Sequence, residues 1–262
     1  MPSTLRRPTK LIVFVASLLG LGAIFVVLGP LRGARFKLYR LQMFSAWSRW
    51  ILKIFGIDVA DNRFNKEMHS GPRVIVANHV SYLDIPVLAS FGPTVFLAKH
   101  EVSTWPLLGW LGRRLGMIFV DRGSLRSRAQ AIHDIRDQIN SGISVVVFPE
   151  GTTSESGPLR GRIPFFAGAF RVARDKSVPV EIFYLDYKPL EKCMWLGDES
   201  FGGHLWNFLA LPSVRVKVRR EWLNKIETRC AQREAHRWSR QWLLEGGHGF
   251  MSAKKKGAWA LH

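Results

Sequence analysis

A histidine and an aspartate stand five positions apart where an apolar stretch of the sequence ends. His79 and Asp84 belong to the run Asn78-His79-Val80-Ser81-Tyr82-Leu83-Asp84, which follows the apolar residues 74–77. A carboxylate that binds one ring nitrogen of a histidine leaves the other nitrogen free to accept a proton. The pair is therefore a candidate acid–base device, with His79 as the base and Asp84 as the group that orients it.

The residues around this pair predict a strand, a loop and a helix. Residues 73–77 have the length and apolar character of a buried strand, and Pro86 indicates that a helix begins near Ile85. Two side chains five positions apart on one helix point away from each other, so only a loop that folds back brings His79 to Asp84. The plainer interpretation is that Asp84 caps the helix and His79 is an ordinary polar loop residue.

Two further apolar stretches, residues 116–120 and 144–148, also end in polar residues. In α/β sheets, ligands bind at the carboxyl ends of the strands. Arginine can hold a phosphate through two parallel hydrogen bonds, and glycine lets a ligand approach the backbone closely. The candidate binding residues at the three strand ends are Asn78, Arg122, Glu150, Gly151 and Thr152. The plainer alternatives are an ion pair of Arg122 with Asp121 or a nearby loop, and an ordinary turn after residue 148.

Strand and helix patterns alternate from about residue 57. Further strands are predicted at 95–98, 178–184 and 214–219, a helix runs from a Ser124 cap to Gly142, and residues 224–244 look helical. The fold class is α/β, with a mixed, largely parallel sheet flanked by helices and an N-terminal membrane-anchoring segment. We divide the chain into a membrane anchor with an interfacial amphipathic helix (1–56), an α/β domain (57–222) and a C-terminal helix with a basic tail (223–262).

The N-terminal segment predicts attachment to a membrane. Residues 11–31 carry no charge and are long enough to cross a bilayer. No cleavage site of small residues follows them, so a retained anchor fits better than a signal peptide. The larger cationic cluster lies after this segment, which favours a cytoplasmic body on a cell inner membrane. A segment that dips in and returns at Gly29-Pro30 is also compatible. Residues 36–55 are amphipathic and basic, which suits the headgroup layer.

The formal net charge of +18 and the pI of about 10.7 call for an anionic partner. Nucleic acid, anionic lipid and an acidic substrate all qualify. The two cysteines, Cys193 and Cys230, lie far apart and match no metal or disulfide spacing, so we interpret them as ordinary thiols. No metal-ligand spacing is present, and we expect no metal.

In order and spacing, four blocks of this chain resemble those of the glycerolipid acyltransferase family, whose best-known members are bacterial 1-acylglycerol-3-phosphate acyltransferases. The resemblance covers roughly residues 73–184 and rests on the following blocks: Asn78-His79 with Asp84, Gly116 with Asp121-Arg122, Phe148-Pro149-Glu150-Gly151-Thr152, and Val178-Pro179-Val180. The first and third blocks together are highly specific.

The resemblance implies an O-acyltransferase at the membrane. The donor would be acyl-CoA or acyl carrier protein, the acceptor a lysolipid hydroxyl, and the favoured reaction the conversion of 1-acyl-sn-glycerol 3-phosphate to phosphatidic acid. His79 would take the hydroxyl proton, Asp84 would hold the ring, and Arg122 with residues 150–152 would position the headgroup. We expect no cofactor beyond the donor, and an anionic membrane surface as a partner.

Two departures from the family pattern open an alternative acceptor. Thr153 stands where many members have an arginine, and residues 164–168 lack the basic residue that many members carry. Both remove positive charge near the expected acceptor site, so a lyso-ornithine lipid is the alternative acceptor.

Three other classes compete with an acyltransferase. A membrane-tethered nucleic-acid binder fits the charge, but no recognisable module is present, so we expect no nucleic-acid partner. A non-catalytic lipid-binding scaffold would carry a damaged His–Asp pair, whereas here both residues are intact. A lysolipid hydrolase would use water as the acceptor and release free fatty acid.

Overall fold

The computed structural model describes residues 3–28, 33–63, 71–148, 153, 168–195 and 199–223. Its helices are α1 (Ser3–Val27), α2 (Ala34–Phe55), α3 (Asp84–Ala89), η1 (His100–Thr104), α4 (Leu108–Leu115), α5 (Leu125–Asn140), α6 (Gly168–Asp175), α7 (Leu190–Cys193) and α8 (Phe201–Phe208). Its strands are β1 (Ile57–Arg63), β2 (Val74–Ala77), β3 (Thr94–Lys99), β4 (Ile118–Val120), β5 (Ser144–Val147), β6 (Val180–Lys188) and β7 (Val214–Leu223).

The strands form one seven-stranded sheet in the order β1-β7-β6-β2-β5-β3-β4. All neighbouring pairs are parallel except β6 and β7, which run antiparallel. This arrangement confirms the predicted mixed, largely parallel sheet. Every residue of β2 and β5 is buried, because these short strands lie in the middle of the sheet with neighbours on both sides.

The predicted strands are all present, with bounds shifted by a few residues, and one strand was not predicted. In β7, Val214, Val216 and Val218 are buried and the residues between them are exposed, as the alternating pattern indicated. The missed strand, β1, has the sequence IDVADNR and forms one edge of the sheet against β7. Its polar residues hide it from pattern analysis, because an edge strand needs no continuous apolar run.

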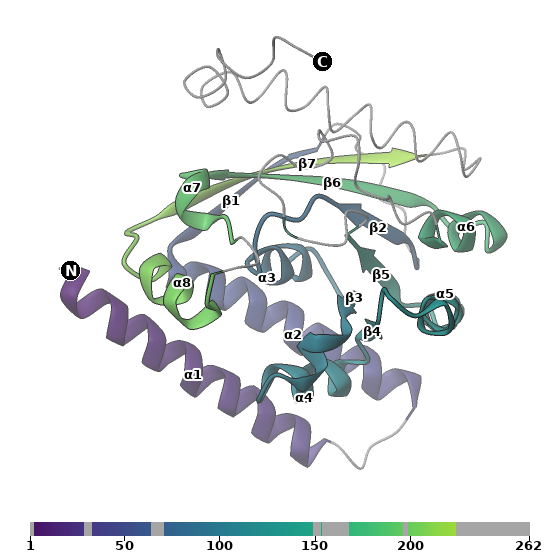
Figure 1. The fold of residues 1–262 in the computed structure, drawn as a ribbon, viewed down its shortest axis with the longest axis horizontal. Coiled ribbons are helices and arrows are strands. Elements are labelled where there is room, and N and C mark those ends of the chain that lie inside the picture. The colour runs from purple at the N-terminus through teal and green to yellow at the C-terminus, as the bar shows by residue number, and fades with distance from the viewer. Residues whose placement is uncertain are drawn as a thin grey trace, which may run out of the picture.

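Helices α1 and α2 lie side by side along one side of the molecule (Figure 1). Phe14 of α1 packs on Phe55 of α2, with ring centroids 5.4 Å apart. Helix α2 ends at Gly56, whose φ of 75° lies in the left-handed region that glycine tolerates. Beyond α1, α2 packs against α3, β1 and β3. The two N-terminal helices are thus joined to the body along their length.

Helices α5 and α6 contact each other near β2, β4 and β5, and α7 and α8 contact each other beside the C-terminal part of β6 (Figure 1). Ser124 caps α5 as predicted, since its side chain accepts a hydrogen bond from the Ser127 backbone N–H. The bend predicted at Gly29-Pro30 and the helix predicted at 224–244 lie outside the described residues. The division into three parts stays a prediction.

Candidate active site

The loop after β2 folds back and brings the two predicted catalytic residues together. His79 Nδ1 and Asp84 Oδ2 lie 2.8 Å apart. The Asp84 side chain is fully buried, while 20% of the His79 side chain is exposed. A carboxylate can only accept, so Nδ1 carries the proton in this contact and Nε2 is left with its lone pair. The arrangement is that of a base held by an acid, with the base open to a ligand.

Asp84 also holds the loop in its folded shape. The same oxygen, Oδ2, accepts the backbone N–H groups of Val80 at 2.8 Å and Ser81 at 3.0 Å. Asp84 is the first residue of α3, yet its side chain turns back to the preceding loop rather than capping the helix it begins. Of the two roles considered from the sequence, the contact with the imidazole is formed and the helix cap is not, and the same carboxylate also binds the backbone of the loop.

The second oxygen of Asp84 has a partner that the sequence motifs did not indicate. Tyr187, on β6, donates its hydroxyl proton to Asp84 Oδ1 over 2.6 Å and is completely buried. Burial, aided by the neighbouring carboxylate, raises the pKa of the Tyr187 hydroxyl well above its ordinary value, so it stays a donor. No sequence signal marks this residue, since it lies 103 positions from Asp84 and belongs to none of the motifs considered above.

Two residues at neighbouring strand ends flank His79. The ring of Phe148, directly after β5, stacks on the His79 imidazole with centroids 4.0 Å apart. On the other side, the Asn78 side chain binds β6: its amide donates to the Leu185 carbonyl at 3.0 Å and accepts the Leu185 N–H at 2.8 Å. Asn78 thus continues the pairing of β2 with β6 past the end of the strand. Its predicted role in substrate binding stays a prediction.

Arg122 follows β4, at the same edge of the sheet as His79 but some distance from it. Because β5 and β3 lie between β2 and β4, three spacings of about 4.8 Å put the two strand ends roughly 14 Å apart. Within the described residues, Arg122 makes no ion pair, and Asp121 instead accepts the Gly123 N–H at 2.9 Å. The ion pair with Asp121 is therefore not formed among these residues, whereas Glu101 of η1 acts electrostatically on the Arg122 guanidinium, and the predicted role of Arg122 in binding stays a prediction.

The remaining predicted binding residues, Glu150, Gly151 and Thr152, lie outside the described residues. They follow β5, which is the immediate neighbour of β2. Only the order of the strands relates them to His79, because in the sequence they follow the strand that lies next to β2 in the sheet. Their predicted role in binding stays a prediction.

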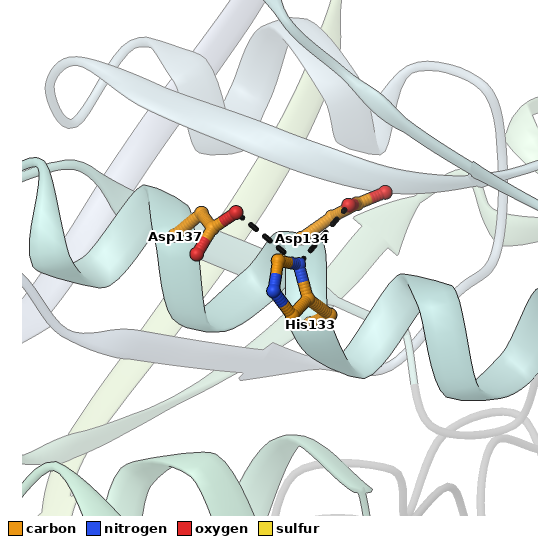
Figure 2. A group of neighbouring side chains, drawn as sticks. All are labelled: His133, Asp134 and Asp137. Carbon is orange, nitrogen blue, oxygen red and sulfur yellow. Dashed lines mark ion pairs between the residues drawn. The ribbon is translucent and has the colours of Figure 1, made fainter.

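Figure 2 shows a cluster that could suggest a metal centre, formed by His133, Asp134 and Asp137 on α5. The His133 ring lies 3.2 Å from Asp137 one turn along the helix, and its side chain is 62% exposed. Ion pairs between residues four apart are common on helix surfaces. Nothing else in the described residues around this cluster indicates a ligand, and we interpret it as a solvated helix face.

Comparison with known proteins places this geometry in context. A family model described as Acyltransferase matches residues 57–182. The lyso-ornithine lipid O-acyltransferase of Pseudomonas aeruginosa is 33% identical over 209 residues, which is 78% of each chain. The 1-acyl-sn-glycerol-3-phosphate acyltransferase of Neisseria meningitidis is 34% identical over 57% of this chain and 59% of its own.

The crystal structure of the 1-acyl-sn-glycerophosphate acyltransferase PlsC from Thermotoga maritima has the same fold. The TM-score is 0.67 with 19% identity, over 93% of this chain and 96% of that chain. The likeness covers a larger share of the chain than residues 57–182, the segment matched by the family model.

Proposed function

The chain belongs to the acyltransferase family, and from this premise we propose that it transfers a fatty acyl group from an acyl thioester to a hydroxyl group of a lysolipid. The observation that carries the proposal is the 2.8 Å contact between His79 Nδ1 and Asp84 Oδ2. It leaves a single ring nitrogen, Nε2, to act on a substrate hydroxyl.

The reaction needs no covalent enzyme intermediate. His79 Nε2 takes the proton of the acceptor hydroxyl while its oxygen attacks the thioester carbonyl carbon, and a C–O bond forms. The C–S bond then breaks, and the imidazolium returns its proton to the departing sulfur. Asp84 keeps the Nδ1–H of His79 in place throughout and stabilises the imidazolium. Coenzyme A and acyl carrier protein both present such a thioester, and we propose both as donors.

Arg122 and residues 150–152 are proposed to bind the acceptor headgroup. The separation of roughly 14 Å between the β2 and β4 ends supports a contact of Arg122 with the headgroup rather than with the reacting atoms. An exposed guanidinium without an ion-pair partner in the described residues suits an anionic group, whether phosphate or carboxylate.

Two acceptors are candidates. The motifs point first to 1-acyl-sn-glycerol 3-phosphate, and the Neisseria meningitidis relative supports it. Two relatives named lyso-ornithine lipid O-acyltransferase match over larger shares of this chain, 78% for Pseudomonas aeruginosa and 66% for Rhizobium meliloti. That larger coverage, together with Thr153 in place of an arginine, favours lyso-ornithine lipid, and the two acceptors are best tested side by side.

We propose that the protein acts at the cytoplasmic face of an inner membrane. The segment Leu5–Val27 of α1 is long and apolar enough to cross a bilayer. It is also fastened to the body, since Lys10 donates to the carbonyl groups of Phe55 at 2.7 Å and Leu211 at 3.0 Å. A helix tied to the body in this way supports insertion from one side, with the anionic headgroups attracted by the surplus of cations.

The test uses the purified full chain in detergent, with labelled acyl-CoA or labelled acyl carrier protein and each acceptor in turn. The expected product is a lipid with one more ester-linked chain, formed from at least one acceptor. His79→Ala should abolish it, whereas His133→Ala, which removes an exposed histidine of α5, should leave turnover unchanged. Release of free fatty acid without acylated lipid would instead identify a hydrolase.

A further inference from the structure

Asp84 is a buried carboxylate whose two oxygens are held from different parts of the chain. Oδ2 receives His79 and two backbone N–H groups of the adjacent loop, all within five residues. Oδ1 accepts the hydroxyl proton of Tyr187, which lies on β6, the strand that pairs with β2. Within the described residues, no lysine or arginine pairs with Asp84. The Tyr187 hydroxyl is thus the one long-range donor that fixes this carboxylate.

Contacts to both oxygens of Asp84 constrain its rotation. A carboxylate held at only one oxygen can turn about its Cβ–Cγ bond, and the direction of its contact with His79 Nδ1 then varies. With Tyr187 holding Oδ1 at 2.6 Å, the plane of the carboxylate is set and Oδ2 stays directed at the imidazole. The orientation of His79 therefore depends on a residue that never contacts it directly.

The hydrogen bond from the Tyr187 hydroxyl also stabilises the negative charge of Asp84. A donor on a carboxylate lowers the attraction of that carboxylate for further protons. Cys193 of α7 is a further titratable group that interacts with Asp84, and burial raises the pKa of its thiol to about 12, so it is neutral. Among the described residues, Tyr187 is thus the distant donor whose removal would leave Asp84 Oδ1 without its hydrogen bond.

We propose that Tyr187 is a positioning residue for acyl transfer, holding Asp84 so that His79 works as the base. This inference rests on the proposed function of the same site. Tyr187 lies beyond residues 57–182, the segment that the family model matches. The Tyr187 ring itself is core packing that phenylalanine can replace, whereas the hydroxyl binds Asp84, so the two contributions can be separated by mutation.

The first test is Tyr187→Phe in the full-length enzyme, assayed with the acceptor that the wild type uses. Loss of a hydrogen bond to a charged group corresponds to a fall in kcat of about 10- to 100-fold, with KM for both substrates within about twofold. The acid limb of kcat/KM against pH should move to higher pH, because the unshared carboxylate holds the imidazolium proton more tightly. Unchanged kcat and an unchanged acid limb would overturn the proposal.

Tyr184→Phe is the matched control, since it removes a buried tyrosine hydroxyl from the same strand without removing a contact of Asp84. In this control, the acid limb of kcat/KM against pH should lie at the same pH as in the wild type. If the wild type acylates no lysolipid, the proposed function fails. If the wild type and Tyr184→Phe turn over and Tyr187→Phe equals them, only the role of Tyr187 fails.

A second variant covers the case in which Tyr187→Phe does not fold. Replacing Tyr187 with 3-fluorotyrosine keeps the ring and the hydroxyl and makes the hydroxyl a stronger donor. The acid limb should then move to lower pH, opposite to the change expected for phenylalanine. A limb that stays at the wild-type position would refute the coupling between Tyr187 and the base.

Discussion

The candidate base is oriented by one carboxylate, and that carboxylate is satisfied by residues both near in sequence and distant. Asp84 has lost all contact with solvent, and its donors compensate for the hydration it gave up. His79 keeps partial exposure, so a substrate can reach Nε2. At the scale of single residues, the buried acid occupies Nδ1 of the partly exposed histidine, so Nε2 is the ring nitrogen that the proposed reaction would use.

Arg122 should contribute to acceptor binding rather than to turnover. Arg122→Ala removes the candidate headgroup contact, so we expect the apparent KM for the acceptor to rise about 5- to 20-fold with kcat nearly unchanged. Steady-state kinetics with varied acceptor measure this. Arg126→Ala, which removes another cation of the same region, serves as the control. A loss of kcat at unchanged acceptor KM would contradict a binding role.

Glu181 is a second buried carboxylate, and its ion pairs with two arginines should contribute to the stability of the fold. It is fully buried on β6 and accepts from Arg73 Nε at 2.5 Å and from Arg220 Nε at 2.7 Å. Breaking a buried ion pair by removing one charge costs about 3–5 kcal/mol. Glu181→Gln should therefore lower the thermal midpoint in detergent by roughly 10 °C. Glu101→Gln, the same change at a surface ion pair with Lys99, should leave the midpoint nearly unchanged. Equal midpoints for both variants would contradict this difference.

At the scale of elements, Trp195 after α7 and His204 on α8 bind the loop between His79 and Asp84. Trp195 N–H donates to the Val80 carbonyl at 3.1 Å, and His204 Nδ1 lies 2.9 Å from the Tyr82 hydroxyl. His204 Nε2 contacts the Met194 carbonyl, which only accepts, so Nε2 carries the proton and Nδ1 accepts from Tyr82. Burial raises the pKa of the Tyr82 hydroxyl, which stays a donor.

Tyr82→Phe should loosen this loop without unfolding the protein. The lost hydrogen bond is worth about 1 kcal/mol, which corresponds to roughly fivefold faster exchange of the Val80 and Ser81 amide hydrogens. Hydrogen exchange followed by mass spectrometry measures this in peptides that cover residues 79–83. Tyr39→Phe, at an exposed position of α2, should leave the exchange of that peptide as it is. Wild-type exchange in Tyr82→Phe would mean that α8 does not hold the loop.

At the scale of the whole molecule, the N-terminal helices present an apolar surface that the body does not cover. On α1, Ile12 is 67% exposed and Leu19 is 56% exposed, while Phe25 on the same helix is fully buried. An exposed apolar face on a helix that also packs against the body indicates a second apolar environment. Under the membrane attachment proposed above, the bilayer would supply this environment, and the formal net charge of +18 would favour an anionic leaflet.

Charge on this surface should release the protein from membranes. Each aspartate placed in the apolar layer costs about 2.5–3.5 kcal/mol, so Ile12→Asp with Leu19→Asp should weaken partition into anionic vesicles at least about 100-fold. Vesicle flotation measures the bound fraction. Leu125→Asp changes a leucine of α5 that is 76% exposed and should bind vesicles as the wild type does. Wild-type flotation of the double variant would assign the membrane contact to another surface.

The sequence by itself determined the elements whose signals are local. Apolar runs predicted β2 and β5, and the Ser124 cap predicted the start of α5. The alternation of strand and helix patterns predicted the fold class, and the order of short motifs predicted the family. The spacing offered a contact between His79 and Asp84 as one of two interpretations, the resemblance to the family favoured it, and the structure shows it formed. Each of these signals spans a few residues, and such short-range preferences are readable without knowing the fold.

Tertiary structure alone decided which distant residues support that site. The place of β6 beside β2 brings Tyr187 to Asp84 and Leu185 to Asn78, and the place of α8 brings His204 to Tyr82. The edge strand β1 likewise exists because β7 pairs with it. These contacts join positions that lie 100 or more residues apart, or depend on strand order, and neither periodicity nor spacing along a chain carries that information.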